Sequence, residues 1–132
     1  MALLQKDLNT ITEGRNLSTK EFNNLIIEAI KDKKGHSIVK LDLRHLDAPA
    51  DFYIVCHGNS DTQAKAIAGG VHRTIKDATG QIPNHIEGMN NGTWVLVDYF
   101  TVLVHVFHKE SRGFYNIEAL WSDAKITEYQ DL

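Results

Sequence analysis

An uninterrupted apolar run at residues 52–56 is the feature that most constrains the fold of this chain. Such a run is typical of a central β-strand that is covered on both of its faces. A polar turn around Gly58 and Ser60 follows the run. Apolar residues then recur at helical spacing, namely Ala64, Ile67, Ala68, Val71, Ile75 and Ala78. This order of strand, turn and helix predicts a sheet with helices packed on it.

The other periodic segments predict two more helices and three more strands. They are a helix over residues 19–33, strands over 37–43, 93–97 and 102–107, and a helix over 111–120. Ser18 and Glu21 match a capping box at the start of the first helix, and Ser60 and Gln63 match a second one. The strands over 93–97 and 102–107 form an expected hairpin. The predicted fold is therefore α/β (α+β), with a single mixed β-sheet flanked by helices.

The 132 residues suit one domain with one core. We expect an N-terminal extension over residues 1–17, with a short helix around 3–8, then the domain over 18–124 and a polar C-terminal tail over 125–132. The N-terminus lacks the apolar centre of a secretory signal, and no apolar run is long enough to span a membrane. The single cysteine, Cys56, fits a reducing compartment, so the expected location is the cytoplasm.

The formal net charge of −3 argues against a general nucleic-acid-binding protein, because such proteins are usually clearly basic. Direct sequence-specific binding to nucleic acid is therefore not expected, and the lack of a long apolar run gives no reason to expect a membrane partner.

The turn "CHGNSDTQ" at residues 56–63 raises the possibility of an enzyme, since a similar Gly-Ser turn opens nucleotidyltransferase sites. Such an enzyme needs converging carboxylates that hold two divalent ions. Asp61 lies in the turn, but the strand segments contain no D-x-D or D-x-E pair. The simpler interpretation is structural, because Gly58 permits a tight turn and Ser60 caps a helix.

Seven histidines raise the question of a metal site. His105 and His108 are three residues apart in a strand, so they point to opposite faces and cannot chelate one ion together. His57 and His72 could each approach the Gly-Ser turn, but no C-x-x-C or H-E-x-x-H motif is present. A hydrolase motif around Ser60 is incomplete as well. No metal, cofactor or catalytic residue is predicted.

Aromatic and acidic residues gather at the hairpin: Trp94, Asp98, Tyr99 and Phe100. A tryptophan in a strand is usually part of the core. Trp and Tyr are also the residues that anchor protein interfaces. Sequence alone leaves this group open between core and interface.

Several blocks of the sequence together resemble the ribosomal silencing factor family, also called the Iojap family. The blocks are "ADFYIVCHGNSDTQAKAIA" (50–68), "IEG" (86–88), "WVLVDY" (94–99) and "VLVHVFHKESRGFYNIEALWSDA" (102–124). The resemblance implies a fold related to nucleotidyltransferases but without their catalytic carboxylates. It implies binding to the large ribosomal subunit through its fourteenth protein, which blocks joining of the small subunit and lowers translation in starvation or stationary phase.

The resemblance also implies which residues face the partner, namely Trp94, Asp98 and Tyr99, with Ile67 as a weaker candidate. It implies a homodimer in isolation, and a role in assembly of the large subunit is an alternative function. A nucleotide-binding enzyme that uses the Gly-Ser turn is a less favoured alternative. The chain departs from the family at Phe100-Thr101, where the family has Gly-Asp, and at Gly113, which suggests that the last helix starts near Phe114.

Overall fold

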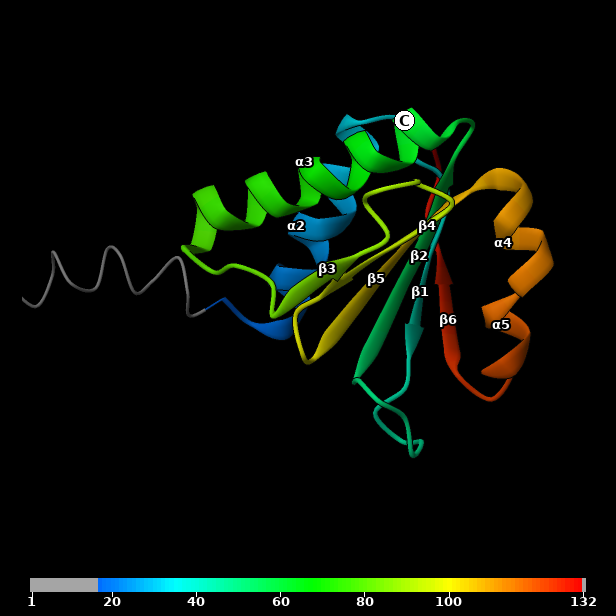
Figure 1. Cartoon of the computed structure of the whole chain (residues 1–132). Helices are drawn as coiled ribbons and strands as arrows, with labels where there is room; N and C mark the ends of the chain where they lie inside the picture. Colours follow the sequence, from blue (N-terminus) through cyan, green and yellow to red (C-terminus); the bar gives the residue numbers. More distant parts are fainter. Residues whose placement is uncertain (1–16, 132) are drawn as a thin grey trace, which may run out of the picture.

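The computed structural model describes residues 17–131, so the expected short helix at 3–8 and nearly all of the extension at 1–17 lie outside the described residues. The elements, in chain order (Figure 1), are α2 (Thr19–Asp32), β1 (His36–Asp42), β2 (Phe52–Gly58), α3 (Asp61–Thr79), β3 (His85–Glu87), β4 (Trp94–Asp98), β5 (Val102–His108), α4 (Lys109–Tyr115), α5 (Ile117–Leu120) and β6 (Lys125–Glu128). Within the described residues, no helix is both long and apolar enough to cross a membrane.

The strands form one sheet in the order β3-β4-β5-β2-β1-β6. Only the central pair, β2 and β5, is parallel; the other neighbouring strands are antiparallel. The prediction of a single mixed sheet flanked by helices is therefore confirmed. The apolar run at residues 52–56 is β2, which lies inside the sheet and is buried along its length, as the sequence predicted.

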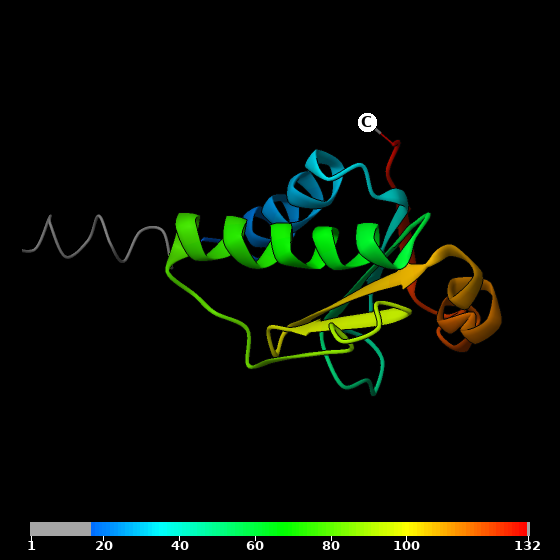
Figure 2. The same cartoon turned by 45° about the horizontal axis from the view of Figure 1, so that its top comes forward.

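Helices α2 and α3 pack on one face of the sheet, here called the α2/α3 face (Figure 2). Alternate residues of the strands point toward these helices, including Ile54 of β2, Val97 of β4 and Val104 of β5, all fully buried. The predicted stripe on α3 supplies Ile67, Val71 and Ile75 from the other side, which confirms the helix predicted from the spacing of 3.6 residues per turn.

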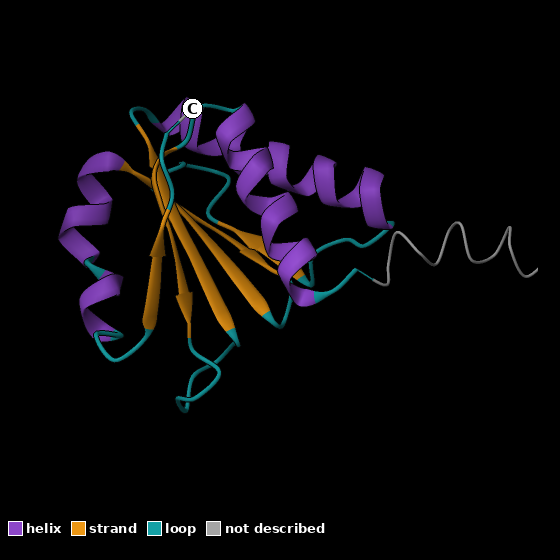
Figure 3. Ribbon diagram, turned by 180° about the vertical axis from the view of Figure 1, so that it is seen from behind, coloured by secondary structure: helices purple, strands orange, loops and turns teal. Residues whose placement is uncertain are grey.

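The opposite face, here called the α4/α5 face, carries a second buried cluster (Figure 3). Leu41, Val55 and Phe107 lie in it, and Ile117 at the start of α5 packs on them. The short helices α4 and α5 cover only part of this face. Leu96 on β4 and Leu103 on β5 point to the same face and remain half-buried.

The expected polar tail over 125–132 is wrong in one respect, because Lys125–Glu128 form the edge strand β6. This strand pairs antiparallel with β1, in a register that sets Leu41 opposite Ile126. All four of its side chains are exposed, so no alternation of apolar and polar residues marked it as a strand. The three-residue strand β3 at the other edge escaped prediction for a similar reason, since two of its three side chains are exposed.

The last helix differs from its prediction in bounds and in burial. It starts at Lys109 rather than near Phe114, runs through Gly113, and breaks at Asn116, whose φ of 45° is left-handed. The break turns α5 away from α4, so the expected common stripe does not form. Only Ile117 is buried, whereas Phe114 and Leu120 are exposed.

The hairpin turn forms despite the unusual residue at position 100. Phe100 adopts a φ of 68°, a left-handed conformation that is costly for a residue with a side chain. The Asp98 carboxylate accepts a hydrogen bond from the Phe100 N–H at 2.7 Å, and Tyr99 N–H donates to the Val102 carbonyl at 2.9 Å. These bonds hold the turn without the glycine that usually occupies such a position.

Candidate functional site

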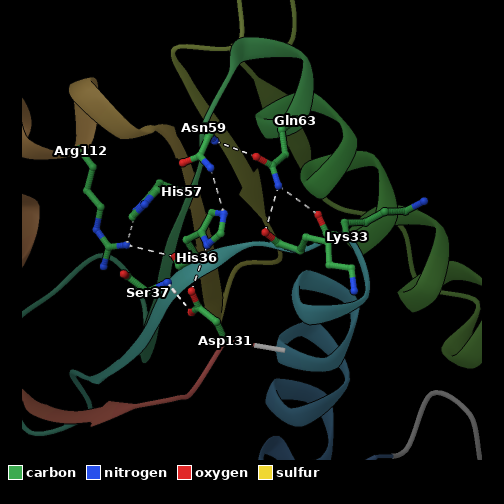
Figure 4. A network of polar contacts seen from close by, with 9 residues as sticks. Lys33, His36, Ser37, His57, Asn59, Gln63, Arg112 and Asp131 are labelled. Atoms are coloured by element: carbon green, nitrogen blue, oxygen red, sulfur yellow. Dashed lines mark hydrogen bonds and ion pairs between the residues drawn. The ribbon is translucent and has the colours of Figure 1, made fainter.

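The Gly-Ser turn lies where the end of β2 meets the start of α3. Ser60 caps α3 by accepting a hydrogen bond from the Gln63 N–H at 3.0 Å, as predicted. The Gln63 side chain, however, does not complete the expected capping box. It accepts from the Asn59 N–H at 2.7 Å and donates to the Lys34 carbonyl at 3.0 Å (Figure 4). The turn is thereby tied to the end of α2.

The same turn is bound to the C-terminal end of the described chain through His36. The Nδ1 of His36 lies 3.0 Å from Asp131 Oδ2, and its Nε2 lies 3.2 Å from the side-chain nitrogen Nδ2 of Asn59. Asp131 also accepts a hydrogen bond from the Ser37 N–H at 2.9 Å. The hydrogen bonds to His36 and Ser37 lower the pKa of Asp131.

Arg112 of α4 closes this network (Figure 4). Its guanidinium lies 3.0 Å from His57 Nδ1 and is paired with Glu118 at 3.1 Å. Burial, together with the nearby positive charge of Arg112, lowers the pKa of His57 to about 4. His57 is therefore neutral near pH 7, and its Nδ1 accepts a hydrogen bond from the Arg112 guanidinium.

These contacts support the structural interpretation of the turn. Ser60 caps α3, the side chains of Asn59 and Gln63 bind neighbouring elements, and Asp61 lies 3.2 Å from His108. Among residues 17–131, no group of three or more His, Cys, Asp or Glu side chains is arranged to hold a metal ion. Cys56 is fully buried, and burial raises its thiol pKa to about 12, as befits a small apolar core residue.

A different surface stands out on the α4/α5 face, where β4 and the start of β5 are not covered. We call it the aromatic face; it consists of Trp94 and Leu96 of β4, Leu103 of β5 and Tyr115 of α4. Trp94, Leu96 and Leu103 are half-buried, and Tyr115 is 47% exposed. An uncovered group of apolar side chains on a strand face is typical of a protein-binding surface.

Trp94 is held rigidly in this face. Its ring stacks on Phe107 at 5.0 Å between centroids and packs at a tilt of 45° against Tyr115 at 4.7 Å. Its indole Nε1–H donates to His105 Nδ1 at 3.1 Å. A large aromatic side chain that is already ordered loses little conformational entropy when it contacts a partner.

Asp98 lies on the same face as Trp94, because the two are four residues apart in one strand. Its carboxylate accepts from the Phe100 N–H and lies 3.5 Å from His85 Nδ1, so its side chain is only 16% exposed. The Asp98 carboxylate therefore mainly stabilises its own turn, and only a small part of it is exposed to a partner.

Tyr99 and Ile67 lie elsewhere. Tyr99 is one position out of step with Trp94 and Asp98, so its side chain enters the α2/α3 face, where it packs edge-to-face on Phe22 at 5.3 Å. It is 7% exposed, and Ile67 on α3 is fully buried in the same cluster. A partner on the aromatic face reaches neither side chain. The structure makes both of them core residues, which corrects the idea of an exposed Tyr99.

Leu96, Leu103 and Tyr115 were missed by sequence reasoning. Leu96 and Leu103 point to the same face of the sheet as Trp94, because Trp94 pairs with Phe107 and Asp98 with Leu103 in the hairpin. Alternation of side chains along the two strands could therefore have identified them. Tyr115 contacts Trp94 only because α4 folds back over the end of β5. No local sequence pattern predicts this contact.

His105 lies beneath the aromatic face and is 5% exposed. Its ring packs 4.5 Å from that of Tyr53, and Nδ1 accepts from Trp94, so Nε2 carries the proton in the neutral form. This Nε2 has no hydrogen-bond partner among the described residues. Burial lowers the pKa of His105 from 6.5 to about 4.

His105 should therefore make stability depend on pH. A lowered pKa in the folded state means that its contribution is complete above pH 6.5 and is lost as the pH falls toward about 4. We expect the free energy of unfolding of the wild type to fall across this window. The variant His105→Gln, which keeps an acceptor for Trp94, should fall less steeply, by up to about 1.4 kcal/mol per pH unit.

Urea unfolding at a series of pH values measures both slopes. His72→Gln, which replaces a half-buried histidine on α3, is the matched control for the loss of one imidazole. Parallel curves for the wild type and His105→Gln would show that His105 does not titrate as its burial requires.

The fold and the surface define an α+β domain with an ordered aromatic face on one side of its sheet. The family model described as "Ribosomal silencing factor during starvation" matches residues 16–132. The chain belongs to the ribosomal silencing factor family, which confirms the resemblance read from the sequence. The family is known for a regulatory role rather than a reaction, and membership supports a silencing role associated with the ribosome.

Individual relatives agree with the family match. Ribosomal silencing factor RsfS of Halalkalibacterium halodurans is 39% identical over 114 residues, which cover 86% of this chain and 97% of the relative. The protein of the same name from Bacillus subtilis is 40% identical, with 85% and 94% covered. A crystal structure of a protein from Chromobacterium violaceum superimposes with a TM-score of 0.77 at 40% identity, covering 80% of this chain and 88% of that one.

Proposed function

We propose that the protein silences translation by binding the large ribosomal subunit through its fourteenth protein, so that the small subunit cannot join. It would act in the cytoplasm, under starvation or in stationary phase, by steric exclusion and without a cofactor. The observation that carries the proposal is the uncovered aromatic face, on a chain that belongs to the ribosomal silencing factor family.

The aromatic face has the composition of a binding surface. Trp94 would serve as the central anchor, with Leu96 and Leu103 as its apolar surround and Asp98 at the rim. A contact of about 1,600 Å² in total would be ordinary for a stable pair. The net charge of −3 suits a basic partner protein. In the absence of the ribosome, a second copy of the chain could cover the same face, which would account for a homodimer.

Assembly of the large subunit is an alternative role that uses the same partner at an earlier time. Nucleotide chemistry at the Gly-Ser turn is less favoured, because the polar groups of the turn are engaged in the network around His36 and Arg112. Calorimetry with nucleoside triphosphate and Mg²⁺ tests this alternative, and a measurable heat of binding would support it.

Sedimentation of the purified protein with separated ribosomal particles tests the proposal. We expect the protein to be recovered with large subunits and not with small subunits. Preincubation of large subunits with the protein should reduce the yield of joined ribosomes when small subunits are added. Recovery with neither particle would contradict the proposal, and binding without any effect on joining would favour the assembly role.

A further inference from the structure

A basic groove lies on the α2/α3 face, at the side of the sheet away from the aromatic face. The groove runs between the first turn of α2 and the strands β1 and β6, and its volume is about 330 Å³. Three lysines line it, one from each of these elements: Lys20, Lys40 and Lys125.

The charges of this groove are not balanced within the described part of the chain. Its one carboxylate, Asp42, is engaged by Arg44 through two bonds of 3.0 and 2.7 Å. These bonds lower the pKa of Asp42 to about 2, so the pair is neutral as a unit near pH 7. None of the three lysines has an ion-pair partner within residues 17–131. The groove therefore attracts anions although the whole chain is acidic.

Asn23 gives an independent sign of a missing ligand. It lines the groove from α2 and is only 1% exposed. Both its Nδ2 and its Oδ1 lack hydrogen-bond partners among the described residues. A buried amide without partners is costly, and a leucine of similar size at this position would be the better choice for stability alone. An amide donor beside three lysines fits the oxygens of an anion.

The walls of the groove indicate which anion fits. Phe52 is 4% exposed, and its ring is already covered by Lys40 Nζ at 5.7 Å and by Arg44 Cζ at 4.9 Å. No aromatic surface of the groove is free for a base to stack on. Lysines bind phosphate as point charges and do not select a base. Recognition would rest on phosphate charge alone.

We propose that the groove of Lys20, Lys40, Lys125 and Asn23 binds phosphate groups, either those of an RNA backbone or those of a free polyphosphate anion. The site is separate from the aromatic face, and its test needs no ribosome, so its failure would leave the proposed function untouched. It also does not require sequence-specific reading of nucleic acid, which agrees with the absence of a base platform.

The test uses the purified chain with two probes, a short fluorescent single-stranded RNA followed by anisotropy and inorganic pyrophosphate followed by calorimetry. At about 50 mM salt, Lys40→Gln/Lys125→Gln should weaken binding by about tenfold. It should also reduce the slope of log affinity against log salt by about 1.4 for RNA, because each contact to a single strand contributes about 0.7.

The matched control is Lys76→Gln/Lys109→Gln, which removes the same charge from exposed positions on α3 and α4. Binding of RNA alone assigns the groove to the phosphodiester backbone, and binding of both probes assigns it to phosphate groups in general. Equal losses in the groove and control variants would overturn the proposal, as would failure of the wild type to bind either probe.

Asn23→Leu separates a ligand-binding role from a structural one without changing charge. We expect its Tm to rise by roughly 3–6 °C, since a buried unpaired amide is removed. We expect binding of the same probes to weaken by severalfold. A raised Tm with unchanged binding would exclude Asn23 from the site, and a lowered Tm would show that the amide is satisfied within the fold.

Discussion

Replacing Trp94 with alanine is expected to weaken binding to large ribosomal subunits by at least roughly 30-fold, the loss that corresponds to a hot-spot residue. Trp94 is the largest side chain of the aromatic face and is held in place by Phe107, Tyr115 and His105. Truncation removes the contact surface itself. It also leaves the His105 imidazole without its donor, so neighbouring side chains lose order as well.

The control for this variant is Ile126→Ala, because Ile126 is 50% exposed on β6, at the far edge of the same sheet. It should bind large subunits like the wild type. Circular dichroism and thermal unfolding must accompany both variants, since Trp94 also contributes to packing. Unchanged sedimentation of a folded Trp94→Ala protein would remove the aromatic face from the proposed interface.

Gly88→Ala is expected to destabilise the fold by about 3 kcal/mol or more. Gly88 follows β3 with a φ of 89°, and a Cβ there would lie 2.0 Å from the carbonyl oxygen of Trp94. Neither atom can yield, because the oxygen belongs to the backbone of β4. An alanine must therefore push β3 away from β4 and displace the start of the strand that carries Trp94.

Gly69→Ala is the matched control. Gly69 lies within α3, and a Cβ there meets nothing within 4 Å. Alanine in a helix interior should stabilise the protein by about 0.5–1 kcal/mol relative to glycine. Urea unfolding of both variants measures the difference, and a Gly88→Ala protein as stable as the wild type would contradict the close approach of the two strands.

Much of the fold could be predicted from the sequence, because a buried helix or strand face gives a local periodicity of apolar residues. The apolar run at 52–56 predicted a strand with cover on both sides, and the stripe from Ala64 to Ala78 predicted a helix packed on it. The capping box at Ser18 and Glu21 marked the start of α2 to the residue. Edge strands were the exception, because β3 and β6 bury few side chains and so leave little trace in the pattern.

Only part of the candidate site could be predicted from the sequence. Trp94 and Asp98 were named from the family resemblance, and both lie on the α4/α5 face. Tyr99 was named with them, but a strand turns successive side chains to opposite faces, so one position decides between surface and core. Tyr99 is a core residue because α2 places Phe22 against its ring. The sequence around the hairpin contains no sign of this contact.

By itself, then, the sequence determined most of the elements, the buried sides of the long helices and strands, and the family. The tertiary structure alone decided the order of the strands, the partial cover by α4 and α5, and the two surfaces that follow from it. Trp94 and Tyr115 meet across 21 positions, and the basic groove joins Lys20 with Lys125. The physical reason is that periodicity records whether a side chain is buried, whereas contacts between distant segments decide which residues share a surface.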